Sequence, residues 1–294
     1  MTAAVKMVSH AGFPAATHED SARDRRRIEA PGRRPAAMDD SYTHQPVTVS
    51  GKTAVVIGGT SGIGEAIALS FASDGADVVA TSRTPERVAD TADRLRDRGA
   101  DTLETTTDIT DRETVEDTRD RTVEAFDGVD ILVTSASAIA RTAVDETTEA
   151  EWQEVLDVQL DGVYRATQVF AEGMTTGSIV HISSLAPQLA ASNLSTYTAA
   201  KGGVDAYTRA AAKELAPDIR VNAIAPGYIV TPQNEALIGE GTEARERIRE
   251  RCPMGDVADR EEVAGAAVYL ASDAASYTTG EVVTVDGLFG RSVF

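Results

Sequence analysis

Short apolar runs alternate with longer amphipathic segments along most of the chain. The run TAVVIGG ends in glycines, SGIGEAIALSFASDGA continues with apolar residues at helical spacing, and DVVATSR is a second short apolar run. A strand, a helix and a strand within about 30 residues form a βαβ unit, which predicts a parallel sheet with right-handed crossovers. The pattern therefore indicates an α/β fold.

The same alternation continues to the end of the sequence. Further strands are expected at 101–107 and in the runs GVDILVTSA, GSIVHIS, DIRVNAIAP and EVVTVDG, and helices at 85–98, 111–126, 148–172, 195–215 and 260–271. This order predicts a Rossmann-like, doubly wound, seven-stranded parallel sheet with helices on both faces, folded as a single domain over residues 48–294.

Residues 1–47 follow a different pattern. They show no hydrophobic periodicity and include the mixed-charge stretch RDRRRIEAPGRRP. Such a composition is typical of a disordered N-terminal extension. A basic interaction arm is the alternative, but the interleaved acids favour a solvated tail.

The acidic charge is concentrated in the predicted domain. The formal net charge is −19 at pH 7; residues 1–45 carry seven basic and six acidic side chains, and the remainder carries 21 basic against 41 acidic. This surface would repel phosphate backbones, so no nucleic-acid partner is expected. Only four of the 28 basic residues are lysines. We hypothesise a salt-loving source organism, in which screening ions limit the repulsion between carboxylates.

Membrane, secretion and metal signals are weak. No run of about 18 apolar residues occurs, so no membrane span is expected. The N-terminal region has no apolar signal core and Cys252 is the only cysteine, which favours a reducing, cytoplasmic location. Three of the four histidines lie in the first 45 residues, so no metal site is predicted.

The turn after the first predicted strand, GGTSGIG, is rich in glycine. Its glycines permit tight backbone angles and let the main chain approach a pyrophosphate at the start of the following helix. The spacing Gly-x-x-x-Gly-x-Gly differs from the commoner dinucleotide fingerprint, and a tight turn without a ligand would also fit it. The predicted cofactor contacts here are Gly58, Thr60, Ser61, Gly62, Ile63 and Gly64.

The end of the second predicted strand indicates which dinucleotide is bound. An acid there would bind the ribose 2′-hydroxyl of NAD and repel the 2′-phosphate of NADP. The strand ends instead in Ser82 and Arg83, a hydroxyl and a guanidinium that suit a phosphate. NADP is therefore the predicted cofactor. NAD is the alternative, in which Arg83 is only a solvated residue at the start of the next helix.

A tyrosine and a lysine stand four positions apart in STYTAAK. Tyr197 and Lys201 would share one face of a helix and could meet the same ligand, although YxxxK alone also fits an amphipathic helix with an exposed lysine. A tyrosine normally has a pKa near 10. We expect the ammonium of Lys201 to favour the phenolate and so to tune Tyr197 for proton transfer near neutral pH.

The ordered set GGTSGIG, TDIT, SS followed by YTAAK, and IRVNAIAPGYIVT resembles the motifs of the short-chain dehydrogenase/reductase family over about residues 50–290. The set is far more specific than any one of its members. The resemblance implies hydride transfer between a nicotinamide cofactor and a secondary alcohol or ketone, with Tyr197 as acid and base and Lys201 also on the cofactor ribose. It selects Ser184, thirteen positions before the tyrosine, to orient the substrate oxygen.

The resemblance implies further contacts. Asp108 and Ile109 would hold the adenine, and Ile229 and Thr231 would close over the nicotinamide. Family members usually form tetramers through their long helices and last strand, so a homotetramer is expected. Apart from its own copies, the only partner expected is a small alcohol or ketone.

Three positions depart from the family pattern. Ile57 replaces a usual threonine, and residues 134–137 read TSAS where NNAG is usual, with Thr134 still predicted to contact the cofactor. Gln159 replaces an asparagine that holds a water in the proton relay behind the lysine, and we place it with the catalytic residues. These departures leave a second hypothesis, a catalytically impaired nucleotide-binding regulatory protein of the same fold.

The segment that sets specificity in this family, here residues 232–255, is strongly charged and has few aromatic residues, which disfavours a large apolar ligand. Its arginines could meet a carboxylate or form a solvated helix face; they are Arg245, Arg247, Arg249 and Arg251. The C-terminal run is most similar to sugar-acid and polyol dehydrogenases and to 3-oxoacyl reductases. The predicted substrate is therefore a sugar acid, a polyol or a 3-oxoacyl compound.

Overall fold

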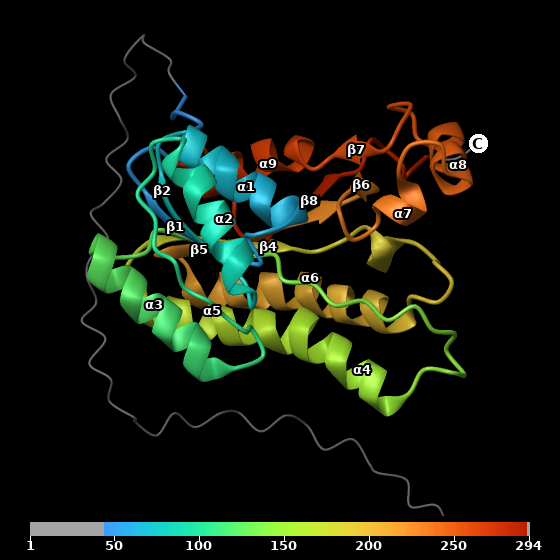
Figure 1. The fold of residues 1–294 in the computed structure, drawn as a ribbon, viewed down its shortest axis with the longest axis horizontal. Helices are drawn as coiled ribbons and strands as arrows, with labels where there is room; N and C mark the ends of the chain where they lie inside the picture. Colours follow the sequence, from blue (N-terminus) through green and yellow to red (C-terminus); the bar gives the residue numbers. More distant parts are fainter. Residues whose placement is uncertain (1–43, 293–294) are drawn as a thin grey trace, which may run out of the picture. The chain divides into compact units, whose positions relative to one another are not determined.

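The protein is built around a parallel six-stranded sheet (Figure 1). The computed structural model describes residues 44–292, and most of the predicted disordered extension lies outside them. The strand order is β2-β1-β3-β4-β5-β8, and each adjacent pair is parallel. The strands are β1 (Thr53–Ile57), β2 (Asp77–Thr81), β3 (Ile131–Thr134), β4 (Gly177–Ile182), β5 (Ile219–Pro226) and β8 (Val282–Val285).

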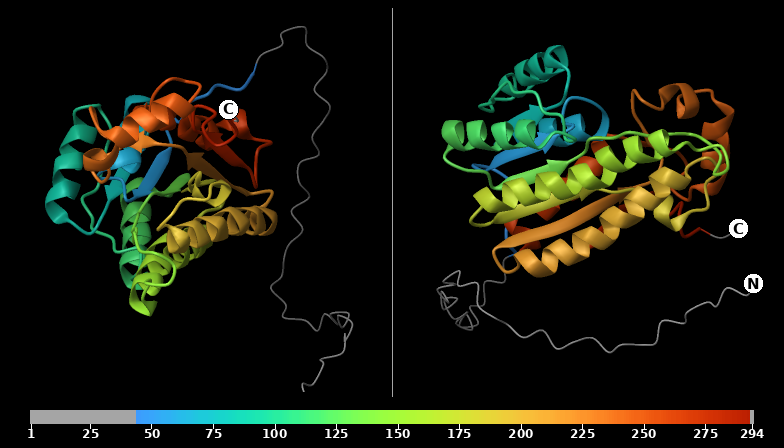
Figure 2. Two further views of the ribbon diagram at one scale, coloured as in Figure 1. Left: turned by 90° about the vertical axis from the view of Figure 1, so that its right-hand side faces the viewer. Right: turned by 90° about the horizontal axis from the view of Figure 1, so that it is seen from below.

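Helices cover both faces of the sheet, which confirms the doubly wound, single-domain fold. Helices α1, α2 and α9 pack on one face, and α3, α5 and α6 lie side by side across the other (Figure 2). None of the helices within residues 44–292 combines the length and apolarity needed to cross a membrane. The helices are α1 (Gly62–Ser73), α2 (Pro85–Arg96), α3 (Arg112–Phe126), α4 (Glu149–Leu156), α5 (Gly162–Gly173), α6 (Ser195–Leu215), α7 (Glu235–Ile238), α8 (Glu243–Arg251) and α9 (Glu261–Ala271).

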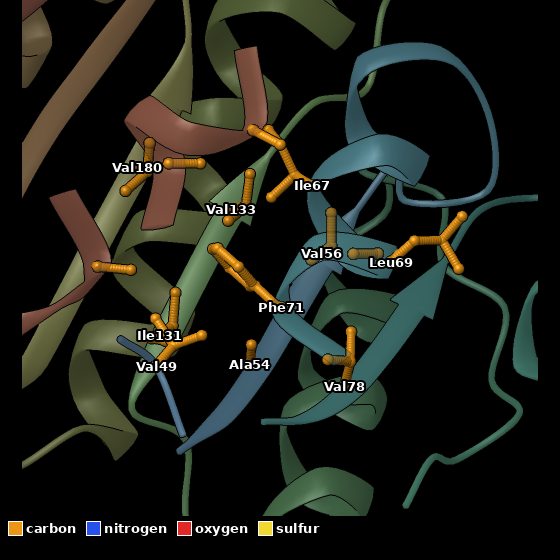
Figure 3. Packing of buried hydrophobic residues seen from close by; sticks show 14 of the residues in the cluster. Val49, Ala54, Val56, Ile67, Leu69, Phe71, Val78, Ile131, Val133 and Val180 are labelled. Atoms are coloured by element: carbon orange, nitrogen blue, oxygen red, sulfur yellow. The ribbon is translucent and has the colours of Figure 1, made fainter. Parts of the chain in front are cut away.

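The apolar run of β1 supplies both layers of the core, because successive side chains of a strand point to opposite faces. Ala54 and Val56 pack with Phe71 of α1 beneath the first helical layer (Figure 3). Val55 and Ile57 belong to the second cluster, with residues of α3, α5 and α6. A strand buried on both faces reads as a continuous apolar run, which is why its sequence predicted a central strand.

The predicted seventh strand, residues 101–107, does not form a ladder. This segment runs beside β2 and is held at its ends, where Val78 N–H donates to the Asp101 carbonyl at 3.1 Å and Thr107 N–H donates to the Ser82 carbonyl at 3.0 Å. Between them, side chains replace the ladder: Thr81 Oγ1 donates to the Thr105 carbonyl at 2.7 Å. Threonine hydroxyls compete with backbone pairing, and the sheet therefore has six strands rather than seven.

The long helix predicted at 148–172 is present but interrupted. A capping box of Thr148 and Glu151 starts α4, and a π-helical turn at Asp157–Asp161 separates it from α5. The predicted segment 232–255 contains α7 and α8, and its flanks pair as a two-stranded sheet of β6 (Ile229–Val230) and β7 (Ala258–Asp259). Apolar periodicity did not predict these short elements.

We predict that Thr81→Val lowers the free energy of unfolding by about 1–3 kcal/mol, because the Thr105 carbonyl loses its partner in a buried position. Urea unfolding monitored by circular dichroism would measure it. Thr106→Val, an exposed site in the same segment, is the matched control and should change stability little. Equal effects of the two substitutions would contradict this account of the segment.

Candidate active site

A cleft of about 1160 Å³ lies at the carboxyl edge of the sheet. Its walls come from the residues that follow β1 to β5, where parallel sheets of this type bind ligands. Most of the predicted site residues line it: Gly58, Thr60, Ser61, Gly62, Ile63, Ser82, Arg83, Asp108, Ile109, Ser184, Tyr197, Lys201, Ile229 and Thr231. Gly64, Thr134 and Gln159 are not on its walls.

The glycine turn between β1 and α1 has no room for side chains at two positions. A Cβ on Gly58 would lie 2.4 Å from the backbone nitrogen of Ala136, and one on Gly64 would lie 2.2 Å from the Gly58 carbonyl oxygen. Gly58 also has φ +81, a conformation that other residues rarely adopt. Gly64 therefore serves the close packing of the turn, and the bare backbone at the start of α1 fits a pyrophosphate.

The end of β2 carries the groups predicted to meet the adenosine ribose. Thr60 Oγ1 donates to Ser82 Oγ at 2.8 Å, which links the glycine turn to this strand end. The Arg83 side chain is 72% exposed, and its Nη1 lies 4.0 Å from Asp108 Oδ2. The guanidinium is thus free to turn toward a phosphate. Arg87, one helical turn further on, also lines the cleft.

Asp108 is held by its own turn. Its Oδ1 accepts hydrogen bonds from the Thr110 N–H at 3.0 Å and from Thr110 Oγ1 at 2.7 Å. The neighbouring Ile109 is 3% exposed and packs in the second core cluster. Both residues line the cleft.

Ser184, Tyr197 and Lys201 meet on one wall of the cleft. Ser184 follows β4, and the other two lie one turn apart on α6, with Lys201 Nζ 5.7 Å from the centre of the Tyr197 ring. Lys201 is 4% exposed and donates to the Ile182 carbonyl at 2.7 Å. The alternative interpretation, an amphipathic helix with an exposed lysine, is therefore wrong.

The ionisation of this group differs from the expectation that an ammonium lowers the tyrosine pKa. Burial raises the pKa of Tyr197, and the Ser184 hydroxyl and the charge of Arg141 oppose that shift only in part. Burial also lowers the pKa of Lys201 to about 7, against the opposing influence of Asp205. Desolvation is thus the largest influence on the pKa of both groups.

Gln159 lies in the π-helical turn and is fully buried. Its Nε2 donates to Ser137 Oγ at 3.0 Å and to the Ala138 carbonyl at 2.8 Å, so the longer amide braces the loop after β3. Its Oε1 has no hydrogen-bond partner. A buried carbonyl oxygen of this kind normally binds a donor, and a water would satisfy it.

Thr134 braces the centre of the sheet instead of facing the cleft. Its Oγ1 lies 3.0 Å from His181 Nδ1 of β4, and both side chains are buried. Burial and the charge of Lys201 lower the pKa of His181 to about 3, so this histidine is neutral. The predicted cofactor contact of Thr134 is therefore wrong, whereas its neighbours Ser135 and Ser137 line the cleft.

The segment after β5 folds over the cleft. Thr231 N–H donates to Asn234 Oδ1 at 2.9 Å, and Asn234 Nδ2 donates to the Ile229 carbonyl at 2.8 Å, so one amide fixes both predicted contacts. A Cβ on Gly62 would lie 3.4 Å from Thr231 Cγ2, which places this segment against the glycine turn.

The four arginines of residues 232–255, the segment that we call the lid, contact other residues of the chain. These contacts favour their interpretation as surface residues. Arg245 and Arg249 both donate to the Asp256 carboxylate, and they lower its pKa. Arg247 donates to Glu243, and Arg251 stacks 4.5 Å from the centre of the Phe289 ring.

Three residues that the sequence did not single out belong to this site. Arg87 and Asp205 could have been found by spacing, since they follow Arg83 and Lys201 by four positions in helices. Arg141 could not, because it lies in the irregular loop between β3 and α4. Within residues 44–292, no group of three or more His, Cys, Asp or Glu side chains is arranged to hold a metal ion.

Comparison with known proteins places the chain among oxidoreductases. Residues 57–288 match the family model described as enoyl-(acyl carrier protein) reductase. The chain is 35% identical to the 3-oxoacyl-acyl-carrier-protein reductase of Thermotoga maritima, over 81% of this chain and 98% of that protein. It is also 35% identical to the 2-dehydro-3-deoxy-D-gluconate 5-dehydrogenase of Bacillus subtilis, over 84% and 97%.

A solved structure is similar over the same region. The gluconate 5-dehydrogenase of Burkholderia cenocepacia, in complex with NADP and tartrate, superposes with a TM-score of 0.80 at 31% identity, covering 84% of this chain and 98% of that one.

We predict that Gly58→Ala weakens NADP(H) binding about tenfold or more, because the added Cβ forces the turn away from Ala136. Titration of NADPH fluorescence would measure the dissociation constant. Gly99→Ala is the matched control: Gly99 has φ +84 with nothing within 4 Å of its Cβ position, so it carries only the backbone strain of about 1–2 kcal/mol. Equal affinity in the two variants would contradict the role assigned to the turn.

Proposed function

Because the chain belongs to the short-chain dehydrogenase/reductase family and is an NAD(P)-dependent oxidoreductase, we propose that it interconverts a secondary hydroxyl group and a ketone on a hydroxycarboxylic acid of the sugar-acid type, with NADP as its cofactor. The observation that supports the substrate class is the exposed Arg141, whose positive charge is one of the influences that lower the pKa of Tyr197.

Arg141 suits a substrate carboxylate for two reasons. It is exposed in the loop after β3, two positions beyond Ile139, which lines the cleft. None of the ion pairs among residues 44–292 includes it. A guanidinium without a partner binds a carboxylate with two parallel hydrogen bonds.

The roles of the other residues follow from their positions. A bound nicotinamide supplies or accepts the hydride. Ser184 orients the substrate oxygen, and Tyr197 gives a proton to that oxygen in reduction and removes it in oxidation. Burial keeps the Tyr197 phenol protonated in the unliganded chain, which is the form that reduction requires.

Lys201 supplies a charge that depends on pH. With a pKa of about 7 its ammonium is fully present well below pH 7, about half present at pH 7, and lost as the pH rises through that value. The charged form would bind the cofactor ribose and stabilise negative charge on Tyr197. We place Gln159 behind this group, where its unpartnered Oε1 could bind the relay water.

NADP rather than NAD is supported by the end of β2. Ser82, Arg83 and Arg87 line the cleft after β2, where we expect the adenosine ribose, and two guanidiniums there would favour a 2′-phosphate. Two features of the relatives agree with the whole proposal: the Bacillus subtilis enzyme is named for a sugar acid, and the Burkholderia cenocepacia enzyme holds NADP and the dicarboxylate tartrate. The homotetramer, the cytoplasmic location and the salt-loving source remain predictions.

We predict that Tyr197→Phe removes turnover by at least about a thousandfold and leaves NADPH affinity within about twofold, since the phenol hydroxyl transfers the proton but little binding energy. Steady-state assays and fluorescence titration would separate the two quantities. A Phe variant that retains wild-type turnover would contradict the assignment of Tyr197.

A screen with both nicotinamide cofactors tests the substrate class. The panel pairs each sugar acid with its neutral polyol, adds 3-oxoacyl thioesters, and is run in dilute buffer and in molar KCl. We expect turnover of acids with NADP, and Arg141→Gln should raise KM for the acids about tenfold or more, because a charged hydrogen bond contributes roughly 1.5–3 kcal/mol. KM for the polyols should not change.

Arg247→Gln is the matched control for that substitution, because Arg247 pairs with Glu243 on the lid surface. It should leave both classes of substrate unaffected. Preference for a neutral polyol or a thioester, or equal losses on acids and polyols in Arg141→Gln, would refute the carboxylate assignment. Binding of NADPH without turnover of any compound would instead favour the impaired regulatory protein.

A further inference from the structure

Asp205 lies on α6 one turn beyond Lys201 and is 9% exposed. Its carboxylate accepts a hydrogen bond from the hydroxyl of Ser183, whose backbone N–H donates to the Ile224 carbonyl at 2.7 Å. Lys201 donates to the carbonyl of Ile182, the preceding residue of β4. Ile182 and Ser183, at the end of β4, are therefore hydrogen-bonded to two successive turns of α6.

These two hydrogen bonds determine where Ser184 lies. Tyr197, Lys201 and Asp205 are spaced by four residues and form one row along α6. Because Ser184 directly follows Ser183, the hydrogen bond at Asp205 fixes the strand end that carries Ser184, whose hydroxyl accepts from the Ala186 N–H at 3.1 Å and lowers the pKa of Tyr197.

Asp205 is also the charged group that acts on Lys201. Burial lowers the pKa of Lys201 to about 7, and the negative charge of Asp205 opposes this. Burial raises the pKa of Asp205 itself, whereas Ser183, Arg209 and Lys201 lower it and favour its ionised form. The neighbouring His181 is neutral near pH 7 because burial holds its pKa at about 3, so it offers no competing charge.

We propose that Asp205 is a positioning residue of the reaction, which sets Ser184 opposite Tyr197 by holding Ser183 and supplies the negative charge that faces Lys201. It is absent from the cleft walls and so acts through these residues rather than on substrate or cofactor. The inference rests on the function proposed for Ser184, Tyr197 and Lys201.

The protonation of Lys201 can be followed without any substrate. The chain contains four lysines, so a protein labelled with ¹³C at lysine Cε gives four signals, and the one absent in Lys201→Arg is assigned to Lys201. In the wild type this signal should titrate near pH 7. Asp205→Asn keeps an acceptor for Ser183 but removes the charge, and should lower the midpoint by at least about one pH unit.

Ser183→Ala separates positioning from charge. It removes the hydrogen bond and keeps the carboxylate, so it should lower kcat about tenfold while the Lys201 midpoint stays within about 0.3 pH units of the wild type. In Asp205→Asn the decline of kcat/KM for reduction at high pH should shift to lower pH together with the NMR midpoint. Asp205→Glu should restore that midpoint, and Glu214→Gln, which removes an exposed charge of the same helix, should change neither quantity.

An unchanged Lys201 midpoint in Asp205→Asn would overturn the role of the charge, and unchanged kcat in Ser183→Ala would overturn the role of the hydrogen bond. Should Asp205→Asn not fold, Asp205→Ser repeats the test with a smaller side chain that still accepts a hydrogen bond. A wild type without turnover on any substrate would refute the proposed function, while the NMR titration would still decide whether Asp205 controls Lys201.

Discussion

The site depends on an ammonium buried at the junction of β4 and α6. Lys201 is 4% exposed, and its Nζ donates to the Ile182 carbonyl at 2.7 Å. A buried cation is costly unless it is paired and hydrogen-bonded. Two groups offset this cost. The backbone oxygen at the end of β4 accepts a hydrogen bond from Lys201, and the carboxylate of Asp205, one turn along α6, favours its charged form. Those contacts also fix the strand end that carries Ser184. The burial of Lys201 therefore costs free energy, but its hydrogen bond helps to position Ser184.

Burial gives the tyrosine and the lysine opposite shifts. Each is pushed toward its neutral form, so the pKa of Tyr197 rises and that of Lys201 falls to about 7. Burial therefore favours a protonated phenol and a lysine whose charge is gained or lost near pH 7. A nicotinium charge beside them would favour the phenolate, which reconciles the high tyrosine pKa found here with the proton exchange that the family motif implies.

Local sequence predicted most of the fold because the strands are buried on both faces and read as unbroken apolar runs. Helix α6 has the predicted bounds, 195–215. The prediction failed at 101–107, where threonine hydroxyls replace the backbone ladder. It also missed α7 and α8, and α8 is held by the ion pairs of Arg245 and Arg249 with Asp256, which lies beyond the end of the helix. Many of the site residues found by motif follow strands of the sheet, and Tyr197 and Lys201 lie on α6; the topology brings these elements together at one cleft. The sequence did not single out Arg141, because no periodic pattern relates this loop residue to Tyr197, which is 56 positions further along the chain.

The acidic surface and the anionic ligands of the proposed reaction set a further constraint. A chain with a formal charge of −19 repels a phosphate-bearing cofactor and a sugar acid at long range. Arg83 after β2, Arg87 in the first turn of α2 and Arg141 in the loop after β3 supply positive charge for these ligands. Long-range repulsion is screened beyond about 10 Å at 0.1 M salt, whereas contacts inside the cleft are screened much less. Added salt would then remove the repulsion and leave the recognition, so we infer that an acidic surface and basic cleft residues are compatible most of all at high ionic strength.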